Sequence, residues 1–243
     1  MVKKRLTGPR SSSVPKERTS MGSLGFVDRC ERSISSLEAV DGVHLERRSA
    51  VFPAGQGNGV EGRLALLEND GISLPEAIRP YVFDVPELHA SWQYSDPVIV
   101  GEFCLGNLPR RLAGGGVPME DSRLPEAQQR ILAELKLIDQ APFSGSGRIA
   151  GLRIPQEGEW EIWYYDMKKS YFGRLDLDYG CYLENVLLTR GAFGWQYLFS
   201  EEDMRAGKYR SVTKNLTSML NTFAALFPDQ DYTALADRLE ARL

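Results

Sequence analysis

DYGCYLENVLLTRGAFGWQYLF (residues 178–199) combines a short amphipathic helix, a glycine stop and an aromatic cluster. Four residues recur at helical spacing and predict one buried helix face: Tyr179, Leu183, Val186 and Leu187. Gly191 follows at the position where a left-handed residue would end such a helix. The stretch after it predicts a brief extended segment with three alternating aromatic residues, Trp195, Tyr197 and Phe199. These residue types form a packed core, so the segment is expected to be structural.

The neighbouring segments predict an α+β fold. Strand patterns occupy the middle of the chain, at residues 98–105, 147–154, 159–166 and 173–178. The turn residues PQEG (155–158) predict that the second and third of these strands form a hairpin. Helical patterns lie mainly towards the two ends. They cover residues 26–37, 64–70 and 124–138, and a further short helix begins at Leu74. Near the C-terminus, one helix has its apolar face at residues 212–223 with Ser211 as a possible N-cap, and a last helix begins at Asp231 with Leu243 on its buried side. This order does not repeat as βαβ units. We therefore expect a single α+β domain over residues 23–243, with a central, mainly antiparallel sheet flanked by helices from the N- and C-terminal parts.

The net charge of -4 is unevenly distributed. Residues 1–20 hold six basic residues and one acidic residue, a net charge of +5, so residues 21–243 carry -9. Affinity for phosphates requires clustered Lys and Arg, so this acidic body predicts no direct nucleic-acid binding and is compatible with a basic protein partner. Residues 1–22 lack an apolar pattern and predict a disordered basic tail, which either binds an acidic partner or is inert.

Other compositional features predict a cytoplasmic protein without membrane contact. No run of about 18 apolar residues indicates a membrane span, and the N-terminus lacks the apolar centre of a secretory signal. Three cysteines, Cys30, Cys104 and Cys181, are odd in number and far apart. That pattern favours reduced, mostly buried thiols over a disulfide framework.

Motifs that resemble reaction centres have simpler explanations. Residues 57–62 (GNGVEG) match the dinucleotide-binding pattern but lack the preceding strand that it requires, so they predict a loop before a helix. Asp176 and Asp178 resemble the D-x-D metal motif of some glycosyltransferases, yet they also suit the solvent face of a strand. The two histidines, His44 and His89, belong to no recognisable motif. We predict no catalytic, cofactor-binding or metal-binding residues, with a metal-dependent glycosyltransferase as the remote alternative.

The aromatic residues on the strand at 159–166 supply the candidate partner-binding surface. One strand face carries Trp160, Ile162 and Tyr164. The opposite face carries Trp163 and Tyr165, which are either covered by helices or exposed. If they are exposed, they form an aromatic patch with an acidic rim of Glu159 and Glu161, a combination that suits protein binding.

Four stretches together resemble the SUKH superfamily, which contains Smi/Knr-type toxin-immunity proteins and fungal cell-wall regulators. LALLENDGISLPEAIRPYV resembles the leading helix and the Leu-Pro-Glu helix start of the family. ELHASWQYSDPVIVGEFCLGNL and WEIWYYD are similar to its strands, and DYGCYLENVLLTRGAFGWQYLF is similar to its tyrosine-leucine helix and Trp-Gln-Tyr-Leu-Phe cluster. These stretches are residues 64–82, 87–108, 160–166 and 178–199. Residues 83–86 (FDVP) replace an Asn-Gly pair common in the family, which indicates a divergent member.

The resemblance implies a non-enzymatic, cytoplasmic immunity protein. Such a protein binds and neutralises a cognate toxin, often a nuclease, and an acidic inhibitor would suit a basic toxin domain. The alternative implied by the fungal members is a scaffold or signalling adaptor, in which residues 1–22 help to recruit other proteins.

Overall fold

The computed structural model describes residues 25–48, 59–69, 71–117, 120–156 and 158–243. The first half contains α1 (Phe26–Glu38), β1 (Val43–Arg48), α2 (Gly59–Asn69), the 3₁₀ helix η1 (Glu76–Tyr81), β2 (Glu87–Ser95), β3 (Val98–Gly106) and α3 (Leu108–Ala113). The second half contains α4 (Glu126–Glu134), β4 (Lys136–Gln140), β5 (Arg148–Arg153), β6 (Glu161–Asp166), η2 (Met167–Lys169), β7 (Tyr171–Leu175), α5 (Tyr179–Thr189), η3 (Trp195–Phe199), η4 (Gly207–Tyr209), α6 (Arg210–Leu226) and α7 (Thr233–Glu240).

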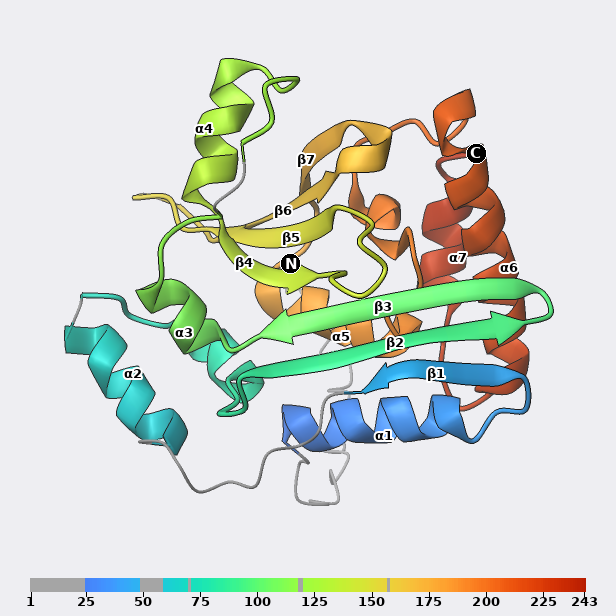
Figure 1. Cartoon of the computed structure of the whole chain (residues 1–243), viewed down its shortest axis with the longest axis horizontal. Helices are drawn as coiled ribbons and strands as arrows, with labels where there is room; N and C mark the ends of the chain where they lie inside the picture. The colour runs from blue at the N-terminus through green and yellow to red at the C-terminus, as the bar shows by residue number, and fades with distance from the viewer. Residues whose placement is uncertain (1–24, 49–58, 70, 118–119, 157) are drawn as a thin grey trace, which may run out of the picture.

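The strands form two antiparallel sheets, β1-β2-β3 and β4-β5-β6-β7 (Figure 1). Helix α1 runs alongside β1, and α6 and α7 stand together at one end of the long β2–β3 hairpin (Figure 1). The predicted single α+β domain is confirmed, with its strands divided between two sheets. The predicted tail, residues 1–22, lies outside the described residues, as do Gly57 and Asn58 of the glycine-rich motif. The rest of that motif belongs to α2.

The 178–199 segment lies at the centre of the core. Helix α5 buries the predicted residues Tyr179, Leu183 and Val186, while Leu187 is half-buried. Arg190 adopts the left-handed conformation one residue before Gly191, so the helix ends slightly earlier than predicted. The predicted extended segment is wrong: Trp195–Phe199 is a 3₁₀ helix in which all five side chains are buried. Because core surrounds this segment on every side, alternation of residue types did not reveal its backbone.

Residues 191–193 also extend the first sheet. The amide of Glu102 donates to the carbonyl oxygen of Gly191 at 3.0 Å, and the amide of Phe193 donates to the carbonyl oxygen of Val100 at 2.9 Å. The segment after α5 therefore lies against β3 like a short additional strand. This contact fixes α5 relative to the β2–β3 hairpin.

The apolar faces of α1 and α6 are buried as predicted. The buried residues are Phe26, Cys30, Ile34 and Leu37 in α1, and Val212, Leu216, Met219, Leu220 and Phe223 in α6. The predicted N-cap Ser211 instead lies inside α6. Leu243, predicted to be buried beyond α7, is about half exposed (51%) because α7 ends at Glu240.

Two further element boundaries differ from the prediction. The helix expected at residues 124–138 ends at Glu134, and the next residues form β4, which pairs with β5. Ile138 is buried, but it lies in a strand and not in a helix, because pairing between strands overrides the local periodicity. The strand expected at residues 173–178 ends at Leu175. No helix in the described part of the chain has both the length and the apolar character that crossing a bilayer requires.

Candidate functional sites

The structure separates the predicted aromatic patch into buried and half-buried parts. Tyr165 is fully buried in a small core cluster beneath α4, with Leu132 and Phe172 among its members. Its hydroxyl group donates a hydrogen bond to Asp121. Trp163 is half-buried and stacks on Phe172, with ring centroids 5.1 Å apart. Tyr165 is therefore covered, whereas Trp163 stays partly exposed, so the two rings do not form the exposed aromatic patch.

The two predicted acidic residues have different environments. Glu161 is held in place by three side chains: Trp163 Nε1 donates to it at 2.9 Å, and Arg174 and Arg153 approach its oxygens at 3.2 and 3.5 Å. Glu159 is exposed and lines a neighbouring surface cleft. Of the four predicted partner-binding residues, Glu159 is the one that reaches this cleft.

This cleft, with a volume of about 820 Å³, lies where β7, α5, η3 and α7 meet. We call it the α5–α7 cleft. Its lining includes Trp160, three arginines and several acidic residues. The arginines are Arg174, Arg238 and Arg242, and the acidic residues include Glu159 and Glu201. The Arg238 guanidinium lies 4.4 Å from the centre of the Phe199 ring, and Arg242 donates to the carbonyl oxygen of Ser200 at 2.7 Å.

Asp176 and Asp178 also line the α5–α7 cleft, but they do not share a strand face. Asp178 is the N-cap of α5 and accepts a hydrogen bond of 2.6 Å from the amide of Cys181. Asp176 forms an ion pair with Arg238 at 3.2 Å. The strand-face interpretation of these two residues is therefore wrong. Their carboxylates have structural partners.

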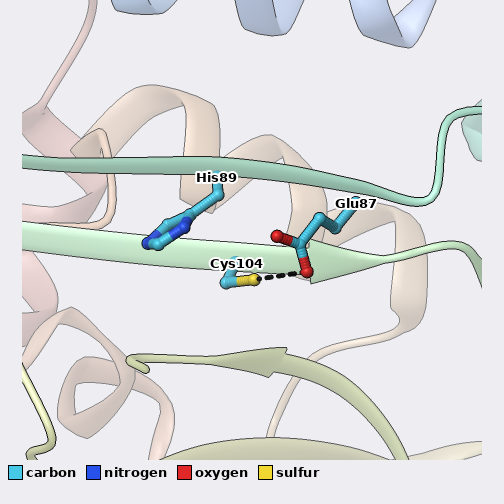
Figure 2. A group of neighbouring side chains, drawn as sticks. All are labelled: Glu87, His89 and Cys104. Atoms are coloured by element: carbon cyan, nitrogen blue, oxygen red, sulfur yellow. Dashed lines mark hydrogen bonds between the residues drawn. The ribbon is translucent and has the colours of Figure 1, made fainter. Parts of the chain in front are cut away.

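A second group of polar residues lies on the β2–β3 hairpin (Figure 2). Glu87 and His89 are two residues apart on β2 and so share a face, and Cys104 of β3 lies directly opposite His89 in the antiparallel register. One potential ligand atom from each of these residues lies within 4.8 Å of the other two. The Cys104 thiol donates to Oε2 of Glu87 at 3.4 Å, as Figure 2 shows. The sequence did not predict that these three residues lie together.

Glu102, which is also on β3, contacts this group through His89. Its Oε1 lies 3.1 Å from Nε2 of His89, and its two oxygens accept hydrogen bonds from the amides of Phe143 and Ser144 at 2.6 and 2.9 Å. Burial by itself would raise the pKa of Glu102, but the hydrogen bonds from these residues hold its pKa below the ordinary value. Glu102 is therefore expected to stay ionised next to the imidazole.

The pKa of Cys104 is shifted upward, in contrast to that of Glu102. Burial raises the pKa of the thiol to about 12, and the negative charge of Glu87 adds to the effect. The thiol is consequently protonated at neutral pH as long as no cation is present. A surface pocket of about 410 Å³ reaches the group and is lined by Glu87, His89 and Phe143. His44, in contrast, is exposed on β1.

Comparison with known proteins identifies no relative: no family model matches the chain, and neither a curated protein nor a solved structure matches it.

Proposed function

We propose that this protein is an immunity-type binding protein that neutralises a cognate toxin domain in the cytoplasm. The proposal is supported by the resemblance of residues 64–82, 87–108, 160–166 and 178–199 to the SUKH superfamily. In the structure these stretches supply half of the buried residues of the main hydrophobic core. The surface observation that carries the proposal is the α5–α7 cleft.

The residue types in the α5–α7 cleft are those that dominate the energetics of protein interfaces. Tryptophan and arginine are enriched among interface hot spots, and here Trp160 lines the cleft together with three arginines. Arg238 is held on one side by the Phe199 ring and on the other by Asp176. A side chain that is already ordered loses less conformational entropy when a partner binds. These two contacts support Arg238 as one of the residues that would contact a partner protein.

The charge of the chain favours a basic partner. Residues 21–243 carry a net charge of -9, and four acidic residues reach the α5–α7 cleft: Glu159, Asp176, Asp178 and Glu201. Complementary charge accelerates encounter more than it increases final affinity, and salt screens it. Reversing Glu159 and Glu201 to lysine is expected to slow association at low salt and to have a smaller effect at high salt.

The direct test is co-expression with the toxin that is encoded beside the gene of this protein. The wild-type protein is expected to restore growth and to co-elute with the toxin in gel filtration. Trp160→Ala combined with Arg238→Ala should weaken the complex at least tenfold, since truncation of a hot-spot residue costs about 2 kcal/mol or more. Absence of both rescue and complex with every neighbouring toxin would refute the proposal.

Arg130→Ala is the matched control for this experiment. Arg130 lies on α4, its side chain is 73% exposed, and its ion pair is with Glu126 on the same helix. This substitution is expected to leave toxin binding unchanged. If it weakens binding as much as the cleft variant does, the α5–α7 cleft is not the binding surface.

Deleting residues 1–22 separates immunity from the adaptor alternative, because immunity requires unchanged neutralisation whereas an adaptor would change its partners.

A further inference from the structure

Glu87, His89 and Cys104 bring together one carboxylate, one imidazole and one thiol near the open end of the β2–β3 hairpin (Figure 2). These three ligand types in one set are characteristic of zinc and related transition metals, whereas calcium and magnesium take oxygen ligands. We propose that Glu87, His89 and Cys104 form a binding site for one divalent transition-metal ion, with Zn²⁺ as the preferred ion. The site is independent of the α5–α7 cleft and of the proposed immunity function.

The spacing of the ligand atoms is close to what a metal requires. Zinc–ligand bonds of about 2.0–2.3 Å in a tetrahedral arrangement place neighbouring ligand atoms roughly 3.3–3.8 Å apart. The Sγ atom of Cys104 and Oε2 of Glu87 are already 3.4 Å apart, and the three candidate atoms lie within 4.8 Å of one another. Completing the set requires side-chain rotations that bring the most distant pair of these atoms closer by up to about 1 Å. The backbone register between His89 and Cys104 needs no change.

Glu102 provides the outer support that metal-bound histidines usually have. A ligating histidine commonly donates its second ring N–H to a carboxylate, which fixes the tautomer and the ring orientation. Glu102 Oε1 lies 3.1 Å from Nε2 of His89, so His89 would bind the ion through Nδ1. The amides of Phe143 and Ser144 hold Glu102 in turn. This support is positioned before any ion binds.

The local charge also favours a cation. Glu87 and Glu102 flank the thiol and the imidazole, and in the described part of the chain neither carboxylate pairs with a lysine or arginine side chain. A divalent cation would offset this negative charge. The pocket of about 410 Å³ beside Glu87 and His89 offers an entry path and room for a water molecule as the fourth ligand.

The binding step exchanges a proton for the metal. The S–H bond of Cys104 breaks, its proton is released to solvent, and Sγ forms a bond to the ion. Glu87 then donates a carboxylate oxygen to the metal instead of accepting the thiol hydrogen bond. No electron transfer accompanies this exchange, and binding should release about one proton for each ion.

The test uses the full-length, reduced protein, stripped with a chelator and titrated with Co²⁺ alone and then with Zn²⁺. One equivalent of Co²⁺ is expected to produce thiolate-to-cobalt charge-transfer absorption, which Zn²⁺ then removes. Cys104→Ser should abolish this absorption, whereas Cys181→Ser, which changes an exposed cysteine elsewhere, should retain it. Absence of the absorption in the wild type, or its loss on Cys181→Ser, would overturn the proposal.

Two further variants keep the test decisive if Cys104→Ser does not fold. Glu87 is exposed, so Glu87→Gln is expected to fold and to lower the affinity for Zn²⁺ at least about tenfold. Glu102 is a positioning residue, and Glu102→Gln should lower the affinity roughly 10- to 100-fold while the thiolate absorption keeps its wavelength. Unchanged affinity in Glu87→Gln would show that these residues do not form the site.

Discussion

The hydroxyl group of Tyr182 donates a hydrogen bond of 2.8 Å to Oδ2 of Asp139, and both side chains are buried. The other oxygen of Asp139 accepts a hydrogen bond of 2.9 Å from the amide of Cys104. One carboxyl group therefore connects α5, β4 and β3, and so joins the two sheets to the central helix. Burial raises the pKa of Asp139 to about 6, although both hydrogen bonds favour its charged form.

Tyr182→Phe is expected to destabilise the protein by about 1–3 kcal/mol, because it leaves a buried carboxyl oxygen without its donor. Tyr164→Phe is the matched control. The Tyr164 hydroxyl is also buried but finds no hydrogen-bond partner among the described residues, so its removal should be neutral or stabilising. Urea unfolding followed by circular dichroism measures both. Equal destabilisation by the two substitutions would contradict a specific role for the Tyr182–Asp139 bond.

Asp121→Asn is expected to make the free energy of unfolding depend less on pH in the acidic range. The Arg123 guanidinium and then the Tyr165 hydroxyl hold the pKa of Asp121 well below its ordinary range. Because the pKa in the folded state is lowered, the stabilisation from Asp121 is fully present near neutral pH and is lost as the pH falls below about 5. Unfolding free energies measured from pH 3 to 7 check this. The wild-type protein should lose more stability on acidification than the variant, and parallel profiles would contradict the prediction.

Arg190→Ala is expected to be less stable than Arg190→Gly by about 1 kcal/mol, since alanine retains the cost of a left-handed backbone that glycine avoids. Both substitutions remove the same contacts. The guanidinium lies 3.4 Å from the centre of the Phe227 ring and donates to the Tyr232 hydroxyl at 3.1 Å. The difference between the two variants therefore isolates the backbone conformation. Chemical denaturation gives this difference, and a more stable alanine variant would contradict it.

Gly101→Ala is expected to destabilise the protein by about 2–4 kcal/mol through overpacking. A Cβ atom on Gly101 would lie 2.4 Å from Cε2 of Trp92. The indole cannot easily move, because its Nε1 donates to the carbonyl oxygen of Arg190 at 2.7 Å. Gly115→Ala is the control, since a Cβ there would meet nothing within 4 Å. Thermal unfolding compares the two, and a wild-type transition for Gly101→Ala would show that the indole relaxes.

Helices with one long apolar stripe were predictable from sequence. The buried faces of α1 and α6 follow from residues such as Ile34 and Leu216, because the periodicity of a one-sided helix records which face is buried. The hairpin of β5 and β6 was predictable for a related reason, since its turn residues separate two apolar runs. Elements buried on all sides left no such record. Trp195–Phe199, whose five side chains are all buried, was assigned to the wrong type for this reason. β4 is only partly buried and was assigned to a helix because its pairing with β5 overrides the local periodicity.

The candidate sites depended even more on contacts between distant segments. Trp163 and Tyr165 were correctly placed on the face opposite Tyr164, but sequence could not decide what covers that face. In the structure, Leu132 of α4 and its neighbours in the small core cluster cover Tyr165 on that face. The β2–β3 group was missed because Cys104 lies far along the chain from His89, and no spacing rule connects them. The alternation of Glu87 and His89 was the one available signal, and it required the strand register to become meaningful.

The sequence by itself determined the α+β class, the helical and strand character of its most periodic segments, and the acidic body, because these depend on local patterns and on composition. Tertiary structure alone decided the burial of Tyr165, the capping role of Asp178, the α5–α7 cleft and the meeting of Glu87, His89 and Cys104. The physical reason is that burial, pairing register and the approach of side chains from separate elements result from the packing of the whole chain. Local preference does not contain that information.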